Sequence, residues 1–157
     1  MTADFDKLKK EMTKFDKIFI DTAPFIYHIE SNPEFRVVTR YFFDLLDNEE
    51  FKAITSTITL TEVLTKPFEI EDEEVIRSFS NIIIDNKKIE LFDIDYRTAI
   101  DAARLRANYS FVKTMDAIQI AAALNHGADG FMTNDSDLKK VNEGMDIIVL
   151  MDFLQEE

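Results

Sequence analysis

Four acidic residues lie directly after predicted strands or near the start of predicted helices, and they are the side chains best suited to chemistry: Asp21, Glu62, Asp116 and Asp135. Carboxylates held a few ångströms apart repel one another, which raises their pKa values unless a cation lies between them. Oxygen ligands of this kind are preferred by Mg²⁺ and Mn²⁺. The four acids therefore predict a divalent-metal site that could activate water for hydrolysis.

Each acid also has a purely structural explanation. Asp and Glu are favoured at helix N-caps and in the first helical turn, where they interact with free N–H groups and with the helix dipole. Thr59 and Glu62 have the spacing of a capping box, so we expect a helix to begin at Thr59. Position alone therefore proves nothing, and it is the combination of acids that favours a metal site.

The composition argues against zinc as the metal. The chain has no cysteine, and its two histidines, His28 and His126, are expected at a helix surface or a helix end rather than in a ligand cluster. A hard divalent ion bound by carboxylates remains the favoured choice.

Short apolar segments alternate with amphipathic segments along the chain. We predict strands at residues 17–21, 51–55, 88–93, 130–133 and 145–150. We predict helices over residues 4–15, from 22, over 34–48, from 59, from the acidic run 69–74 to about 85, and over 95–108, 114–125 and 135–140. This alternation is typical of an α/β fold in three layers, with a parallel sheet covered on both faces. Because ligands bind at the carboxyl edge of such a sheet, we expect the four acids to converge there.

Length and composition predict one domain over residues 1–157, because a chain of this length with 46% hydrophobic residues can bury one core. Residues 1–16 are expected to form an additional N-terminal amphipathic helix. The charged N-terminus, the lack of cysteine and the lack of an apolar run of about 18 residues lead us to expect a cytoplasmic protein with no membrane segment.

The net charge of −13, from 18 basic and 31 acidic residues, argues against a nucleic-acid ligand, because polyanions usually bind basic surfaces. A nuclease that works through bound cations needs acids at its centre and only a local basic rim. Three cations flank Asp116 in the sequence and are candidate substrate contacts: Lys113, Arg104 and Arg106. Two more, Lys139 and Lys140, follow Asp135.

Four segments, taken together and in this order, resemble a known family. They are Ile-Asp-Thr-Ala-Pro-Phe-Ile-Tyr at 20–27, Ser-Thr-Ile-Thr-Leu-Thr-Glu-Val-Leu at 56–64, Asp-Ala-Ile-Gln-Ile-Ala-Ala at 116–122 and Phe-Met-Thr-Asn-Asp-Ser-Asp-Leu at 131–138. Through them the chain resembles PIN-domain nucleases, in particular the VapC-type toxins of prokaryotic toxin–antitoxin pairs.

The resemblance implies a PIN-like three-layer α/β/α fold with a central parallel sheet of about five strands. It also implies an endoribonuclease that hydrolyses RNA phosphodiester bonds with Mg²⁺ or Mn²⁺. The catalytic acids would be Asp21, Glu62, Asp116 and Asp135, the metal ligands among them Asp21, Asp116 and Asp135, and the supporting residues Thr22, Thr133, Asn134 and Asp137. The implied partners are an antitoxin protein, to which the acidic run 69–74 could present a complementary charge, and a second copy of the chain in a homodimer.

Three alternatives remain beside this interpretation. A phosphatase of the haloacid dehalogenase type needs a second Asp two residues after Asp21, where this chain has Ala23. A DNA nuclease or flap-type nuclease would use the same acids, because nothing in them recognises a 2′-hydroxyl group. A catalytically silent PIN module could instead serve as a protein-binding scaffold, for which an acidic surface and an extra helix would be natural.

Overall fold

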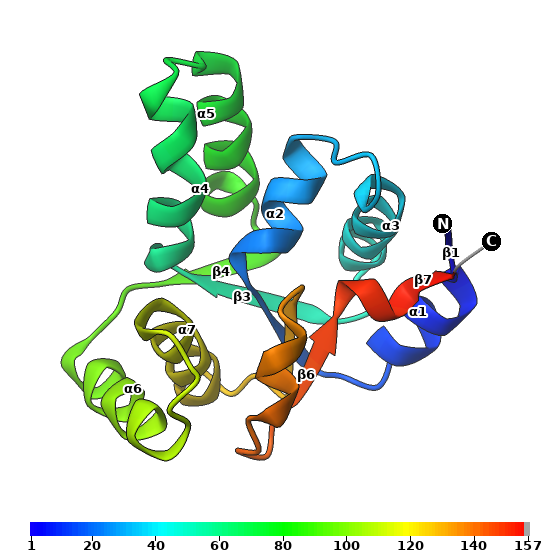
Figure 1. Cartoon of the computed structure of the whole chain (residues 1–157). Coiled ribbons are helices and arrows are strands. Elements are labelled where there is room, and N and C mark those ends of the chain that lie inside the picture. The colour runs from blue at the N-terminus through cyan, green and yellow to red at the C-terminus, as the bar shows by residue number, and fades with distance from the viewer. Residues whose placement is uncertain (156–157) are drawn as a thin grey trace.

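Five parallel strands form the central sheet of the computed structural model, which describes residues 1–155 (Figure 1). Their order across the sheet is β4-β3-β2-β5-β6. The strands are β2 (Lys17–Ile20), β3 (Lys52–Ser56), β4 (Ile89–Phe92), β5 (Gly130–Thr133) and β6 (Asp146–Val149). Phe19 of β2 is in register with Ile54 on one side and Phe131 on the other, so β2 lies at the centre of the sheet.

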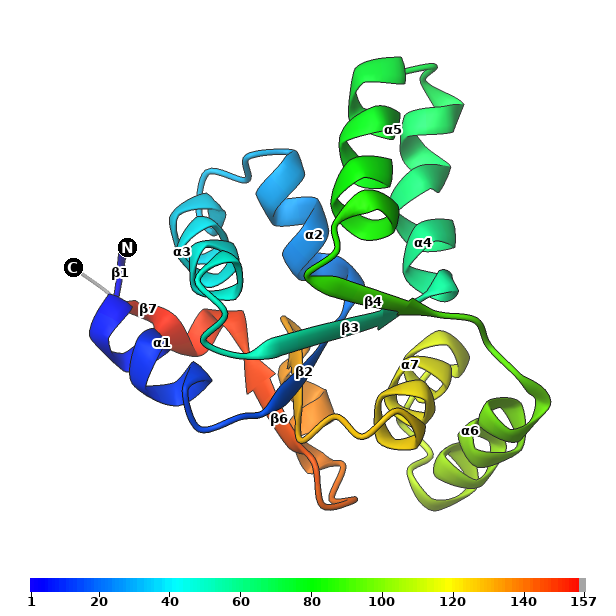
Figure 2. The same ribbon diagram turned by 180° about the vertical axis from the view of Figure 1, so that it is seen from behind.

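Helices cover both faces of this sheet, which confirms the predicted three-layer α/β/α architecture. The α-helices are α1 (Phe5–Met12), α2 (Thr22–Ile29), α3 (Arg36–Asp47), α4 (Thr57–Glu69), α5 (Glu73–Ser80), α6 (Tyr96–Asn108) and α7 (Thr114–Asn125). Three shorter helices are the π-helix η1 (Asn81–Asp85) and the 3-10 helices η2 (Ser136–Lys140) and η3 (Leu150–Phe153). Helices α2 to α5 lie on one face and α6 and α7 on the other, and the view from behind shows the α4–α5 pair projecting beyond the sheet (Figure 2).

Alternating side chains of the strands build two separate cores. Ile18 and Ile20 of β2 pack into the core beneath α1 to α5, whereas Phe19 between them packs into the core beneath α6 and α7. The Phe19 and Phe131 rings stack there with centroids 5.2 Å apart. Because side chains alternate across a strand, these mostly apolar strands serve both layers at once.

Alanine side chains let α7 approach the sheet closely. Ala117, Ala121, Ala122 and Ala123 are all buried in the core shared with α6. The helix ends as predicted, with His126 at the C-cap and Gly127 in the left-handed conformation at φ +77°. Asp116 is thereby held in the first turn of a helix whose middle is buried.

The start of α4 differs from the prediction. The helix begins at Thr57, and its N-cap is Ser56, whose hydroxyl accepts a hydrogen bond from the backbone N–H of Ile58 at 3.2 Å. The capping box of Thr59 and Glu62 is therefore wrong, because a competent cap three residues earlier ends β3 and starts the helix. Glu62 lies in the second turn of α4 and is not at a helix N-terminus.

The helix expected to follow the acidic run 69–74 and to end near residue 85 is present, as α5 and the π-helix η1 that continues it. Helix α4 continues through Pro67 to Glu69, a turn with Glu71 at φ +56° follows, and α5 begins at Glu73 with Asp72 as its N-cap. The last part of the expected helix is the π-helix η1. The acidic run is thus divided between the end of one helix and the start of the next.

Residues near both ends of the chain form a small second sheet that the sequence patterns did not predict. Strand β1 (Thr2–Ala3) pairs antiparallel with β7 (Leu154–Gln155). The predicted N-terminal helix is present as α1, and its N-cap residue Asp4 donates its backbone N–H to the carbonyl of Phe153 at 2.9 Å. The N-terminal segment is therefore attached to the C-terminal one rather than packed alone.

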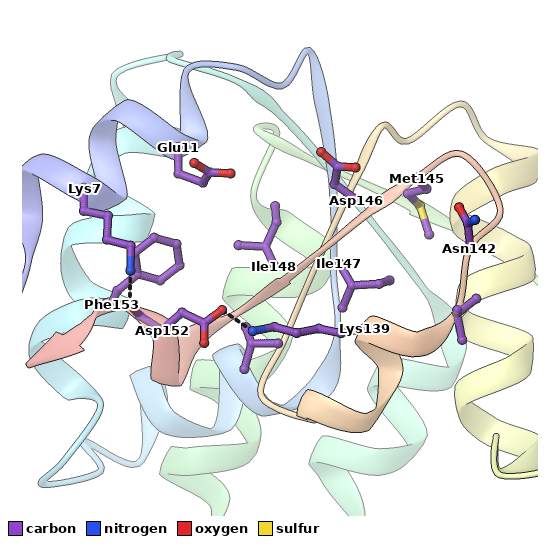
Figure 3. A pocket seen from close by; sticks show the side chains of 12 residues that line it. Lys7, Glu11, Lys139, Asn142, Met145, Asp146, Ile147, Ile148, Asp152 and Phe153 are labelled. Atoms are coloured by element: carbon purple, nitrogen blue, oxygen red, sulfur yellow. Dashed lines mark hydrogen bonds and ion pairs between the residues drawn. The ribbon is translucent and has the colours of Figure 1, made fainter.

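A groove of about 440 Å³ follows the outer edge of β6 between α1 and η2 (Figure 3). Asp152 connects the two sides of the groove. Its backbone carbonyl accepts a hydrogen bond from Lys7 Nζ at 2.7 Å, and its carboxylate accepts one from Lys139 Nζ at 2.5 Å. None of the four candidate acids lines this groove. In the described part of the chain, no helix is long and apolar enough to cross a membrane.

Gly130 packs closely against Phe15 and Ile148, which leaves little room for a side chain. A Cβ at this position would lie 3.0 Å from Phe15 Cδ1 and from Ile148 Cδ1, so Gly130→Ala should lower the free energy of unfolding by about 1–3 kcal/mol through overpacking. Urea denaturation measures the difference. Gly144→Asn is the control, because nothing lies within 4 Å of a Cβ there and Asn tolerates a φ of +80°. Equal stability of Gly130→Ala and the parent protein would contradict the packing described for β5.

Candidate active site

The four candidate acids come from four different elements at the carboxyl edge of the sheet. Asp21 directly follows β2 and is the N-cap of α2, and Asp135 follows β5 as the N-cap of η2. Asp116 lies in the first turn of α7, and Glu62 projects from α4. Because β2 and β5 are neighbours in the sheet, their carboxyl ends place the first two acids on adjacent strands.

Asp21 is fixed by backbone and side-chain hydrogen bonds. Its N–H donates to the carbonyl of Met132 at 2.9 Å, which extends the pairing of β2 and β5 by one residue. Its carboxylate accepts the hydroxyl of Thr133 at 2.8 Å. Both contacts come from the end of β5, so the orientation of Asp21 depends on the register of these two strands.

Burial raises the pKa of Asp21 from 3.8 to about 6, because its side chain is withdrawn from water, with only 8% of the residue exposed. Hydrogen bonds from the Thr22 backbone and the Thr133 hydroxyl act in the opposite direction. The negative charges of Asp116 and Glu62 raise the pKa of Asp21 further. The carboxyl group therefore lies in an environment that favours its proton or a cation.

Asp116 couples electrostatically to the remaining acids. Its pKa is raised, first by burial and then by the charges of Asp135 and Glu62, while Lys113 lowers it. The four acids thus form one electrostatic group, from buried Asp21 through half-buried Asp116 to exposed Glu62 and Asp135. The four acids thus influence one another electrostatically, while their convergence on one ion stays a prediction.

Glu62 is positioned from α2 rather than by its own helix cap. The hydroxyl of Thr22, the residue after Asp21, donates to Glu62 Oε1 at 3.0 Å. This hydrogen bond ties α4 to the first turn of α2, so that the two helices present their acids together. Thr22, which was predicted to support the site, thus contacts one of the four acids directly.

The donor set fits a hard divalent ion. All four side chains offer carboxylate oxygen, and their mutual repulsion would be relieved by positive charge. Among residues 1–155, no three His, Cys, Asp or Glu side chains are arranged so that they could together hold a metal ion. Mg²⁺ is commonly bound through only one or two carboxylates and keeps several waters, so an open set of this kind is compatible with it.

A buried hydrogen-bond network supports the site from below. Gln119 of α7 donates to the hydroxyl of Thr59 at 2.8 Å and accepts from the hydroxyl of Ser56. Thr59 also shares a 2.8 Å hydrogen bond with Thr55, whose hydroxyl donates to the carbonyl of Ile20 at 2.8 Å. The network therefore joins the helix of Asp116, the helix of Glu62 and the residue immediately before Asp21.

These network residues were not among the predicted site residues. Their signal in the sequence is a polar residue where burial is expected, since Gln119 stands in the apolar run 117–123 and three hydroxyl residues follow each other at 55–57. All four network side chains are fully buried, and no buried side-chain N or O atom in residues 1–155 lacks a partner.

The other predicted supporting residues divide into two groups. Asn134 joins separate elements, because its Nδ2 donates to the Tyr27 hydroxyl at 3.3 Å and its Oδ1 accepts from the Met151 N–H at 3.0 Å. Asp137 is exposed and forms an ion pair with Lys140 at 3.1 Å. Its backbone N–H donates a hydrogen bond to Asp135 Oδ1 at 3.0 Å. Asp135 rather than Asp137 faces Asp116 electrostatically.

The predicted basic rim is mostly engaged elsewhere. Lys113, the N-cap of α7, is the predicted substrate contact that acts on the pKa of Asp116. Arg104 is held by Asp101 at 2.6 Å on the outer helix α6, whose last turn carries Arg106. Lys139 is bound to Asp152. The structure thus places Lys113 near Asp116 and pairs Arg104 and Lys139 with other acids.

Comparison with known proteins identifies related sequences and folds. A family model for the PIN domain matches residues 18–144. A search of curated protein sequences gives no significant match.

Solved structures with a similar fold include toxins of toxin–antitoxin pairs. The VapBC2 structure of Rickettsia felis, bound to a promoter DNA fragment, gives a TM-score of 0.65 at 17% identity over 85% of this chain and 98% of the other. A toxin–antitoxin complex from Klebsiella pneumoniae gives 0.62 at 20% identity over 85% and 97%. A sarcin–ricin loop cleaving VapC toxin from Mycobacterium tuberculosis gives 0.65 at 14% identity over 78% and 92%.

Asp21→Asn should stabilise the chelator-treated protein at neutral pH. Because the folded-state pKa of Asp21 is raised from 3.8 to about 6, the folded protein keeps a proton there that the unfolded chain loses. The free energy of unfolding therefore falls as pH rises from about 4 to 6, by an upper limit of about 3 kcal/mol. Asn retains the acceptor for Thr133 and removes this cost, so Asp21→Asn should be about 1–3 kcal/mol more stable than the parent at pH 7.5 and equal to it near pH 4.

Urea denaturation at both pH values, in EDTA, measures this difference. Asp6→Asn, an exposed position in the first turn of α1, is the control. A parent protein that is as stable as Asp21→Asn at pH 7.5 would show that Asp21 ionises at no cost.

Gln119→Leu should lower the free energy of unfolding by about 1–3 kcal/mol, because it leaves the buried hydroxyl of Ser56 without its acceptor. Thr39→Val is the matched control. Thr39 is also a buried hydroxyl, but it bonds within its own helix to the Phe35 carbonyl, which keeps the N–H of Thr39 as a partner. Thermal unfolding of both variants compares the two, and an equal loss would mean that the network adds nothing beyond one hydroxyl.

Proposed function

The chain belongs to the PIN domain family, and from this premise we propose that it is a divalent-metal-dependent endoribonuclease of the VapC toxin type. The observation that carries the proposal is the electrostatic coupling of four acids at the carboxyl edge of the sheet. Similar folds are found in toxin–antitoxin complexes and in a toxin that cleaves the sarcin–ricin loop, an RNA. The likeness to the sarcin–ricin loop cleaving toxin is the support for RNA as the substrate.

The ion would be held by Asp21, Asp116 and Asp135, and it would be Mg²⁺ or Mn²⁺. When bound, such an ion lowers the pKa of water and stabilises negative charge on a phosphate group. The assignment rests on oxygen donors alone and requires no Ser, Cys or His nucleophile.

The residues of the chain would supply position and charge. Thr133 holds the Asp21 carboxylate through the 2.8 Å hydrogen bond, and Thr22 directs Glu62 through the 3.0 Å one. Glu62 is exposed and accepts a hydrogen bond from Thr22, the residue after buried Asp21. In this position it would accept a proton from water or orient that water. The Gln119 network keeps α4 and α7 in a fixed relation, so that the acids need not be reorganised for each turnover.

We further propose an antitoxin as the protein partner and a homodimer as the assembled form, acting in the cytoplasm. The net charge of −13 and the acidic run 69–74 suit a basic segment of a partner protein. Masking the acids with such a segment would silence the nuclease without any change in its fold.

The test is RNA cleavage by the purified protein. We expect a mixed structured RNA pool to be cut in Mn²⁺ or Mg²⁺, with no cutting in EDTA and a loss of at least about a hundredfold in Asp116→Asn. Asp6→Asn should cleave as the parent does. Cleavage that persists in both EDTA and Asp116→Asn would contradict the proposal. If the ion raises the melting temperature while no RNA is cut, the catalytically silent scaffold becomes the better account.

A further inference from the structure

A hollow between α2 and α3 is lined by His28, Ser31, Arg36, Val37 and Arg40. Its volume is about 530 Å³. Arg36 and Arg40 are one helical turn apart on α3, His28 comes from the last turn of α2, and Ser31 comes from the loop that joins the two helices. The hollow thus gathers two guanidinium groups, an imidazole and a hydroxyl.

No carboxylate lines this hollow, although the chain carries a net charge of −13. Each of the four other hollows described in this structure includes at least two acidic residues in its lining. Within residues 1–155, Arg36 and Arg40 form no ion pair, whereas Arg104 and several lysines are paired. These two cations are exposed and can bind an anion from outside.

The walls of the hollow are ordered by contacts of their own. The His28 ring is half-buried and packs on Phe43 of α3 with centroids 4.5 Å apart. In the connecting loop, Asn32 Oδ1 accepts the backbone N–H groups of Glu34 and Phe35 at 2.9 and 3.1 Å. Asp44 and Asp47 act on His28 from later turns of α3, but neither lines the hollow. The donors are therefore presented by a fixed frame.

We propose that this hollow binds a backbone phosphate of the RNA strand whose scissile bond lies at the four acids. The inference rests on the proposed function and adds the phosphate-binding site that the predicted rim of Lys113, Arg104 and Arg106 leaves open. Guanidinium groups match phosphate through paired N–H donors, and two of them with a hydroxyl form a suitable phosphate cradle.

The length of α2 gives the spacing. Thr22 stands at the acidic end and His28 six residues later, which is about 9 Å along the helix axis at about 1.5 Å per residue. The acids and the hollow are therefore close enough for nearby parts of one strand to reach both. A single-stranded substrate could be held at both the acids and the hollow, with α2 setting the distance between them.

The experiment measures binding of a fluorescein-labelled, mixed-sequence single-stranded RNA to the full chain in the cleavage-deficient Asp116→Asn background. Arg36→Gln with Arg40→Gln is the test variant, and Arg77→Gln with Arg97→Gln, two exposed arginines on α5 and α6, is the charge-matched control. We expect the test variant to bind about threefold to tenfold more weakly. The slope of log K against log salt should fall by about 0.7, because one phosphate is no longer neutralised. The control and the melting temperatures should not change.

Equal affinity and equal slope in the parent and the test variant would overturn the inference, and so would equal losses in the test and control variants. An increase of melting temperature by inorganic phosphate that disappears in the test variant, with RNA binding unchanged, would assign the hollow to a free anion and overturn the RNA interaction. Failure of the proposed function is seen separately. With Asp116 intact, the test variant should show a raised KM and a nearly unchanged kcat, whereas a chain that binds RNA through the hollow and never cleaves it would contradict the nuclease alone.

Discussion

The burial of one carboxylate at the junction of two parallel strands is the constraint on which the rest of the site depends. Asp21 is fixed where β2 and β5 separate, with its N–H on Met132 and its carboxylate on Thr133. An acid withdrawn from water in this way is costly unless it is protonated or faces positive charge. The neighbouring acids Asp116 and Glu62 add to that cost instead of relieving it. Positive charge beside Asp21 would therefore stabilise the arrangement.

Much of this arrangement could be predicted from the sequence, because it follows from patterns that are local. The apolar segment before Asp21 and the one before Thr133 predicted two strands of a parallel sheet, and the sheet then predicted that the following acids share an edge. Helix α7 was equally clear from its alanines and its C-terminal glycine. These are the features for which side-chain period and helix-ending residues carry the information.

Other features could not be predicted because they depend on choices between equivalent local signals or on distant contacts. Ser56 and Thr59 are both suitable N-caps, and only the end of β3 decides for Ser56. The role of Gln119 depends on three hydroxyls more than 50 residues away in sequence, two of which it contacts directly. The two-residue strands β1 and β7 are too short for any alternation to be recognised. Sequence patterns thus found the acids, but not the polar frame that holds them.

The pairing of β1 with β7 has a consequence for how the chain folds. Thr2 pairs with Gln155, so this ribbon closes a loop that contains all five strands of the central sheet. Closing it costs chain entropy for only a few hydrogen bonds, whereas every pair of neighbouring strands in the central sheet is joined by a shorter stretch of chain. The ribbon can form only once β6 and η3 have placed β7 beside the N-terminal segment. Its opening would free β1 and β7, while Leu8 and Met12 keep α1 in the core and the strands that carry the acids remain paired. The ribbon is therefore a unit of local unfolding distinct from the central sheet.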